Sequence, residues 1–187
     1  VHGVTAHLWG YKAHPADIGL ELHVSDEHAI VKEHLHKLGF YFGAFPDGYA
    51  WIFPRRKDAS IGLGLPTKQA RRARGLLSDF LASLELPREL ADKARGHGIP
   101  LFSPLTRRPV CRGNILLAGD AASFVDPITA EGIYYALKSG EEASRAIINA
   151  LSSDTEAAGV YQNALNSSIL PELKAAWKLS IPFNAFQ

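Results

Sequence analysis

The sequence has no methionine and only one cysteine, Cys111, among its 187 residues. A single cysteine cannot form a disulfide within the chain, and such sparing use of cysteine is typical of a reducing compartment. No apolar run approaches the ~20 residues that a membrane-spanning helix needs, and no charged-then-apolar signal sequence opens the chain. We therefore predict a cytoplasmic protein, with peripheral contact to a membrane as the alternative. Because the chain opens with Val1, we also expect it to be part of a longer sequence.

The net charge of the chain is also small. The chain has 20 basic and 19 acidic residues, a formal charge of +1, so no global attraction to nucleic acid is expected. The region 55–74 is locally basic, with Arg55, Arg56, Lys57, Lys68, Arg71, Arg72 and Arg74 against Asp58. This excess could contact phosphate or an anionic membrane. A solvated helix face plus a basic turn is the simpler interpretation.

The sequence has 8 histidines but no pattern of metal ligands. His28, His34 and His36 are close in sequence, yet no cysteine or carboxylate joins them at ligand spacing. Residues two positions apart on a helix do not share a face. We predict no metal site, and we interpret Cys111 as a small buried residue in preference to a reactive thiol.

The first half of the chain predicts an antiparallel meander. A strand over 18–24 precedes three strand-like runs, at 40–45, 49–53 and 59–65, with a Pro-Asp-Gly turn at 46–48. Because successive side chains of a strand point to opposite faces, six aromatic residues should share one face of this sheet. They are Phe40, Phe42, Phe45, Tyr49, Trp51 and Phe53. Helices are expected at 25–39, 67–86, 87–96, about 130–151, 155–165 and 168–179.

The stretch GNILLAGDAASFVDPITAEGIYYALKSG, residues 113–140, indicates a strand, a loop and a helix. The apolar run 115–118 is typical of a strand covered on both faces in a parallel sheet. Asp120 would follow at its carboxyl end, where ligands of open α/β sheets bind. The amides of 130–133 would point toward a negative charge. A plain strand–loop–helix unit capped by an Asp is the alternative.

The helix of this unit should have one apolar face, and the small residue Gly140 within it should permit close contact with a sheet. That face consists of Ile133, Leu137, Gly140, Ser144, Ile147 and Leu151.

This stretch resembles the second FAD-binding motif of flavoproteins with the p-hydroxybenzoate hydroxylase type of fold, and within them the geranylgeranyl reductase family most closely. The resemblance implies that Asp120 binds the ribityl chain of FAD and that Pro127 lies near the flavin ring. It also implies that the helix start stabilises the negative edge of a reduced flavin. The implied cofactor-binding residues are Gly119, Asp120, Pro127, Ala130, Glu131, Gly132 and Ile133. Ala130 is a mild departure, since family members often have glycine there.

A second stretch, YAWIFPRRKDASIGLGL at 49–65, resembles the geranylgeranyl reductase pattern of aromatic-x-Trp-x-Phe-Pro followed by Gly-x-Gly. A row of aromatic side chains beside glycines on the next strand would form a flat apolar trough suited to a polyprenyl chain. The implied substrate-binding residues are Tyr49, Trp51, Phe53, Pro54, Gly62 and Gly64. An ordinary aromatic sheet core is the alternative. The resemblance runs from about residue 19 to residue 150.

The two resemblances imply a mixed α+β and α/β fold: an antiparallel substrate-domain sheet with helices, plus a returning strand–helix unit of a Rossmann-type FAD domain. The expected segments are a substrate-binding domain at 1–105, the returning segment at 106–151 and C-terminal helices at 152–187. The family's Gly-x-Gly-x-x-Gly fingerprint for the ADP part of FAD is absent from these residues. We therefore expect the C-terminal part of a flavoprotein, whose partner is the missing N-terminal part of the FAD domain. This part alone should bind FAD weakly or not at all, and it should lack activity.

The implied enzyme is an FAD-dependent oxidoreductase that reduces prenyl (geranylgeranyl) double bonds of a lipid or pigment precursor. NADPH or a ferredoxin would supply the electrons, and no catalytic side chain is assigned because the flavin carries the hydride chemistry. A flavin monooxygenase or a quinone-linked flavoprotein dehydrogenase of the same fold is the nearest alternative. A non-catalytic lipid-binding module, built on the aromatic trough and the basic region, is an alternative of another class.

Overall fold

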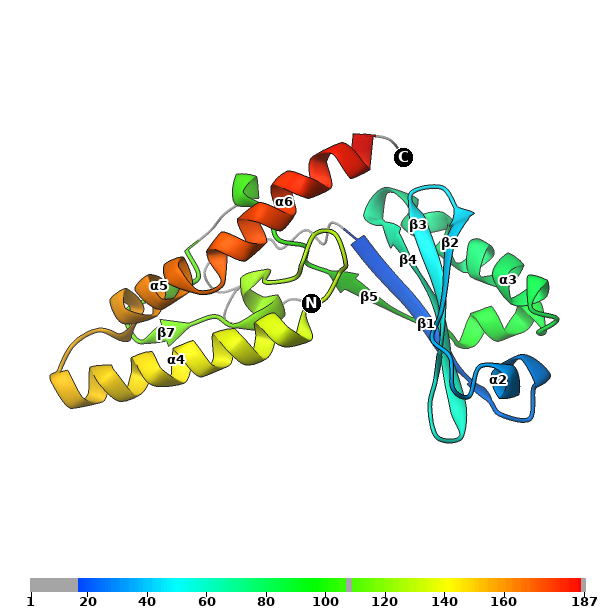
Figure 1. Cartoon of the computed structure of the whole chain (residues 1–187), viewed down its shortest axis with the longest axis horizontal. Coiled ribbons are helices and arrows are strands. Elements are labelled where there is room, and N and C mark those ends of the chain that lie inside the picture. The colour runs from blue at the N-terminus through cyan, green and yellow to red at the C-terminus, as the bar shows by residue number, and fades with distance from the viewer. Residues whose placement is uncertain (1–16, 107–108, 186–187) are drawn as a thin grey trace. The chain divides into compact units, whose positions relative to one another are not determined.

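The computed structural model describes residues 17–106 and 109–185, with the side chains of 106 and 182–185 left aside (Figure 1). The described residues divide into two compact units, 17–98 and 99–185, which we call the sheet unit and the helical unit. Each unit has its own cluster of buried apolar side chains. The domain boundaries predicted after residues 105 and 151 stay a prediction.

The sheet unit is built on a five-stranded sheet with the strand order β2-β3-β4-β1-β5. Its strands are β1 (Asp17–Ser25), β2 (Gly39–Phe45), β3 (Gly48–Pro54), β4 (Asp58–Pro66) and β5 (Arg95–Ile99). The pairs β2–β3, β3–β4 and β1–β4 are antiparallel. The predicted antiparallel sheet is confirmed, and β1 lies beside β4 although β2 and β3 separate them in sequence.

One face of this sheet forms the core of the unit. Alternate residues of β1 and β4, among them Leu22 and Leu63, are buried on that face. Helix α3 (Ala73–Ser83) contributes Leu77 and Leu81, both with no exposed surface. Because apolar burial stabilises by about 25 cal/mol per Å², this packing fixes which face of the sheet stays available for a ligand.

The helices predicted around the sheet are shorter than expected. The 25–39 helix is reduced to α2 (Ala29–Glu33), and 67–86 is divided into the 3-10 segment η1 (Thr67–Arg72) and α3. The 87–96 helix is the 3-10 segment η2 (Arg88–Lys93), followed directly by β5. At the end of α2, the His34 ring lies 2.8 Å from the Ile30 carbonyl and 3.0 Å from the Tyr41 hydroxyl. These contacts tie the chain to β2 at the point where the helix was expected to continue.

Phe45 was predicted on the aromatic face, and this assignment is wrong. The pairing of β2 with β3 is irregular between Phe42 and Phe45, and Gly43 within the irregularity has φ +78°. A bulge of this kind inserts a residue and reverses the side that later residues face. Phe45 is therefore buried in the core, with its ring 6.1 Å from that of Phe80.

The helical unit consists mainly of α4 (Ile133–Ser153), α5 (Ala157–Ser167) and α6 (Leu170–Ala185). Short segments precede them: η3 (Pro104–Thr106), β6 (Cys111–Arg112), β7 (Ile115–Leu116) and η4 (Gly119–Ala122). Tyr161 of α5 is fully buried, and its hydroxyl donates a 2.8 Å hydrogen bond to the Leu117 carbonyl. Among the described residues, no helix is both long and apolar enough to cross a bilayer.

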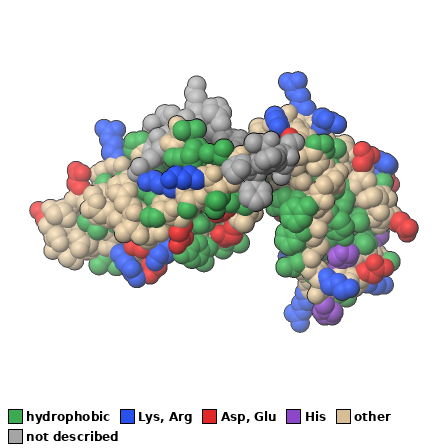
Figure 2. Space-filling model, turned by 45° about the horizontal axis from the view of Figure 1, so that its top comes forward, with side chains coloured by type: hydrophobic (Ala, Val, Ile, Leu, Met, Phe, Trp, Pro, Cys, Tyr) green, Lys and Arg blue, Asp and Glu red, His purple; other side chains and the backbone are tan. Residues whose placement is uncertain are grey.

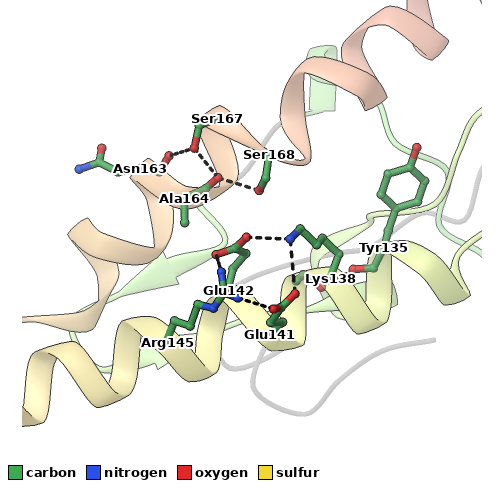
Figure 3. Close-up of polar contacts among 10 residues, drawn as sticks. Tyr135, Lys138, Glu141, Glu142, Arg145, Asn163, Ala164, Ser167 and Ser168 are labelled. Atoms are coloured by element: carbon green, nitrogen blue, oxygen red, sulfur yellow. Dashed lines mark hydrogen bonds and ion pairs between the residues drawn. The ribbon is translucent and has the colours of Figure 1, made fainter.

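Helix α4 has a charged side near α5 (Figure 3). Lys138 Nζ lies 3.4 Å from Glu141 Oε2 and 3.3 Å from Glu142 Oε1. Arg145 Nη2 is 2.5 Å from Glu141 Oε1. These pairs are spaced three or four residues apart, as expected for neighbours on one helix side.

The predicted apolar face of α4 is largely exposed. Ile133 is 76% exposed, Leu137 72% and Leu151 82%. The predicted close contact at Gly140 is absent from the described part of the chain, since a Cβ added there would meet no atom within 4 Å. This face is left without a covering element among the described residues.

The strand predicted over 115–118 is also shorter than expected. Only β7 is regular, and it pairs antiparallel with β6 as a two-stranded ribbon instead of joining a parallel sheet. Ile115 is 46% exposed, whereas Leu117 is buried. A single parallel bridge joins Leu101 to Val125 in the loop that follows.

Candidate substrate and cofactor sites

The sheet unit carries a continuous row of rings on the side opposite its core. We call this set the aromatic face: Phe40, Phe42, Tyr49, Trp51 and Phe53. Ring centroids of Tyr49 and Trp51, and of Trp51 and Phe53, are each 5.8 Å apart. Phe40 contacts Phe53 edge-on at 5.1 Å. These separations lie in the range of favourable aromatic pairs.

Two glycines of β4 lie directly beside these rings. Gly62 pairs with Trp51 and Gly64 pairs with Tyr49 across the β3–β4 ladder. A Cβ added at Gly62 would lie 2.4 Å from Trp51 Cζ2, and one added at Gly64 would lie 3.3 Å from Tyr49 Cε1. The structure thus brings five of the six predicted substrate residues into contact or pairing, because the glycines leave the space that the rings occupy. The sixth, Pro54, ends β3 next to Phe53.

The indole of Trp51 is held by a polar relay that the sequence did not reveal. Its Nε1 donates to Ser60 Oγ at 3.0 Å, and that hydroxyl donates to Glu21 Oε2 at 2.7 Å. Ser60 pairs with Phe53 and Glu21 pairs with Gly62, so the relay crosses three strands. The one sequence feature that pointed to this relay was the alternation of side chains along β1. It places Glu21 on the other face of the strand from the apolar Leu20 and Leu22.

Two titratable groups near one end of the aromatic face, those of Asp17 and Tyr49, are partly desolvated. Burial raises the pKa of the Asp17 carboxyl. Burial also raises the pKa of Tyr49, and the negative charge of Asp17 adds to that rise. Desolvation of both groups indicates an environment suited to an apolar ligand.

In the helical unit, Gly119 begins the turn η4 that packs on α4. Its φ is +52°, and an added Cβ would lie 2.9 Å from Ala136 Cβ. Its amide donates to Ser139 Oγ at 2.9 Å. Only glycine combines this backbone conformation with such close contact, so position 119 fixes where Asp120 lies.

The Asp120 carboxylate faces the turn that leads into α4. A Cβ added at Gly132 would lie 3.4 Å from Asp120 Oδ1 and 3.2 Å from Val125 Cγ2. The side chain is half-buried and accepts no hydrogen bond from the residues that the structure describes. A carboxylate beside a glycine fits the predicted role of binding a sugar-like hydroxyl.

The amides at the start of α4 are only partly available. The helix begins at Ile133, three residues later than about Ala130, and Ala130 itself has φ +58°. The Ala130 amide donates to the Asp126 carbonyl at 3.0 Å, and the Glu131 amide to Thr129 Oγ1 at 3.2 Å. Within the described chain, the Gly132 and Ile133 amides have no acceptor.

The loop between these parts is ordered by Asp126. Its Oδ1 accepts from the amides of Ile128 at 2.8 Å and Thr129 at 2.9 Å, which closes a turn around Pro127. Pro127 is half-buried in this turn. The predicted cofactor residues therefore lie together within one loop and helix start.

Cys111 is half-buried, with Sγ 3.4 Å from the Ala158 carbonyl. Burial raises the pKa of its thiol, which keeps the sulfur protonated and less nucleophilic. Within the described ranges, no group of three or more His, Cys, Asp or Glu side chains could hold a metal ion.

Residues 19–94 match the model of the geranylgeranyl reductase catalytic domain. The chain is 35% identical over 118 residues to the digeranylgeranylglycerophospholipid reductase of Methanocaldococcus jannaschii, a match covering 58% of this chain and 29% of that protein. The chain therefore spans less than a third of that relative's length.

Two solved structures share the fold. A geranylgeranyl bacteriochlorophyll reductase-like protein of Thermoplasma acidophilum superposes with a TM-score of 0.67 and 21% identity, covering 93% of this chain and 46% of that one. A probable FAD-dependent monooxygenase of Pseudomonas aeruginosa gives a TM-score of 0.58 and 19% identity, covering 92% and 50%. The predicted fold class is confirmed. The resemblance to the geranylgeranyl reductase family that the two motifs predicted is confirmed as well, since residues 19–94 match the catalytic domain of that family.

Proposed function

We propose that the whole protein is a flavin-dependent oxidoreductase that reduces double bonds of a prenyl chain in a lipid or pigment precursor. The observation that carries this proposal is the contact of Trp51 with β4, where only Gly62 leaves room for the indole. An ordinary aromatic core would not need a glycine opposite both Tyr49 and Trp51. A row of partly exposed rings suits a long, flexible hydrocarbon.

The aromatic face would bind the prenyl chain by dispersion and by exclusion of water. The Glu21–Ser60 relay would hold the Trp51 indole in one orientation, so that little side-chain entropy is lost when a ligand binds. Binding energy of this kind positions the reacting double bond, while the chemistry comes from the cofactor.

FAD is the cofactor that the second site fits. Asp120 would accept a hydrogen bond from the ribityl chain, and the amides of Gly132 and Ile133 would face the negative edge of a reduced flavin. Gly119 and Pro127 would shape the loop, with Ala130 and Glu131 forming the turn before the helix. When bound, FAD supplies the hydride chemistry, and NADPH or a ferredoxin would be the electron donor.

A monooxygenase or a quinone-linked dehydrogenase remains the second candidate because the fold is shared. Reduction is favoured because the match to the reductase catalytic domain covers β1 to η2, including the whole aromatic face. Peroxide release during NADPH oxidation without substrate would favour a monooxygenase. A lipid-binding module without catalysis leaves the arrangement around Asp120 unexplained. We further propose a cytoplasmic protein with a peripheral membrane contact.

The test is the kinetics of a Trp51→Ala variant of the whole protein with prenyl substrates of increasing length. We expect KM for a long prenyl chain to rise about tenfold or more, because a large buried aromatic contact is lost. A short substrate that does not reach Trp51 should show little change. Equal KM values for variant and wild type at every length would remove the aromatic face from the substrate site.

A further inference from the structure

The sheet unit has one strongly basic corner, where the β2–β3 turn meets η1. Gln69 donates from Nε2 to the Pro46 carbonyl at 2.7 Å, and Lys68 Nζ lies 2.8 Å from Asp47 Oδ2. These contacts seat η1 against the turn. Arg71 and Arg72 follow on η1, are exposed, and have no acidic partner among the described residues. Asp47 thus offsets Lys68 alone, and the corner keeps a positive charge.

The same corner exposes an apolar surface. The β2 bulge leaves Phe42, Gly43 and Ala44 exposed in succession, and the Phe42 side chain is 78% exposed. Phe42 stacks on Phe40, with centroids 6.1 Å apart and planes at 8°. Figure 2 shows hydrophobic side chains gathered on the surface of this unit, with basic side chains also at its surface. The exposed aromatic ring therefore lies at one end of the aromatic face.

The other basic group of this unit is arranged differently. Arg56 and Lys57 lie in the β3–β4 turn, at the opposite end of the nine residues of β4, roughly 27 Å away at ~3.4 Å per residue. There the Asp58 carboxylate lies 3.5 Å from Arg55, and the Asp26 amide donates to the Lys57 carbonyl at 3.2 Å. The Asp58 carboxylate thus offsets Arg55 at that end. The basic region 55–74 is thus two separate groups at opposite ends of β4, and the η1 group is the one at the same end as the exposed Phe42 ring.

We propose that the corner formed by Phe42, Arg71 and Arg72 docks on an anionic membrane surface. The arginines would contact lipid phosphates while the Phe42 ring enters the headgroup region. This inference rests on the proposed function in one respect: it gives a prenyl chain a route from the bilayer onto the aromatic face, through Phe42 and Phe40. The docking itself needs neither flavin nor prenyl ligand.

Vesicle co-sedimentation of the 187-residue chain tests the proposal. The vesicles contain phosphatidylcholine alone or with phosphatidylglycerol, and no prenyl lipid. We expect binding to the anionic vesicles only. The double variant Arg71→Ala/Arg72→Ala should lower the partition coefficient about 30-fold, because each basic residue near an anionic surface contributes about fivefold. Phe42→Ser should lower it at least threefold.

The matched control is Arg56→Ala/Lys57→Ala, which removes the same charge from the other end of β4. The partition coefficient of this variant onto the anionic vesicles should stay within twofold of the wild-type value. Equal losses in the two double variants, or equal binding to both kinds of vesicle, would overturn the proposal, as would no binding at all. Circular dichroism confirms that each variant is folded. Trp51→Ala should bind vesicles like wild type, so a failed reductase assay and a failed docking assay are distinguishable.

Discussion

Trp51 can lie against β4 only because position 62 has no side chain. The Cβ that alanine would bring is 2.4 Å from the indole and 2.6 Å from the Leu20 carbonyl. The carbonyl belongs to a paired strand in the middle of the sheet, so it cannot move away without disturbing the β1–β4 ladder. The indole must therefore be displaced, which would also stretch its hydrogen bond to Ser60.

For Gly62→Ala we expect the free energy of unfolding to fall by about 1–3 kcal/mol, as for overpacked sites. The displaced indole should also become more exposed, with a red-shifted emission. Urea denaturation and Trp fluorescence measure the two effects.

The matched control is Gly64→Ala, whose added Cβ would be 3.3 Å from Tyr49 Cε1. At position 64, alanine reduces the conformational freedom of the unfolded chain, which offsets the tighter contact in the folded chain. The free energy of unfolding should therefore change by no more than about 1 kcal/mol. Equal destabilisation at both positions would contradict the indole contact as the cause.

At this scale, strand alternation was sufficient to predict that Tyr49, Trp51 and Phe53 share a face. It failed at Phe45, since the bulge at Gly43 inverts the alternation and leaves no clear mark in the sequence. The relay from Trp51 to Glu21 was not predictable either. It depends on the register between β1 and β4, whose partners are 39 residues apart in the Ser60–Glu21 bond.

Among the elements, α4 has an unusual distribution of side chains. Its charged cluster includes Glu142, which is 8% exposed, while Leu137 and Leu151 on another side are largely exposed. A water-soluble helix normally shows the reverse arrangement, with its apolar stripe covered. Exposed apolar patches of this kind mark interaction surfaces or sites of association.

We expect the 187-residue chain to bind the dye ANS and to self-associate through this stripe. The double variant Leu137→Glu/Leu151→Glu should reduce ANS fluorescence severalfold and shift the chain toward monomer. It should leave the thermal midpoint nearly unchanged, because neither side chain is buried. Sedimentation velocity and dye titration provide the measurements. Leu137→Met/Leu151→Met, which keeps the stripe apolar, should retain both properties; loss of dye binding there would speak against hydrophobic contact.

The sequence predicted α4 well because its apolar residues recur at helical spacing over 21 residues. It predicted the preceding strand poorly. The apolar run 115–118 is as compatible with a short ribbon as with a parallel strand, since periodicity cannot distinguish short apolar runs. The helices at 67–86 and 87–96 were recognised as helical regions, but 3-10 turns replace parts of them.

At the scale of the whole molecule, the buried apolar residues form two clusters that share no member. One contains Leu77 and lies in the sheet unit, and the other contains Leu165 and lies in the helical unit. The unfolding of each unit can also be followed with a different tryptophan. Trp51 is the only tryptophan in the sequence between Ala16 and Gly98, whereas Trp177 packs against the second cluster. Separate cores allow separate unfolding transitions.

Leu77→Ala should therefore destabilise the sheet unit by about 2–5 kcal/mol and leave the helical unit unaffected. With fluorotryptophan labelling, the urea midpoint of the Trp51 resonance should fall while that of Trp177 stays constant. Leu165→Ala should give the reciprocal result. If both resonances shifted together in either variant, the two clusters would behave as one cooperative core.

The rings above Gly62 and Gly64 also set a length scale. Side chains on one face of a strand recur every two residues, and the centroids of Tyr49 and Trp51, and of Trp51 and Phe53, are each 5.8 Å apart, so the three rings span at most about 12 Å. A hydrocarbon lying along β3 meets a new ring at each interval until it passes the last one. Beyond that span, further carbons gain no additional ring contact on β3. The row thus acts as a molecular ruler, sensitive to chain length below its span and nearly indifferent above it.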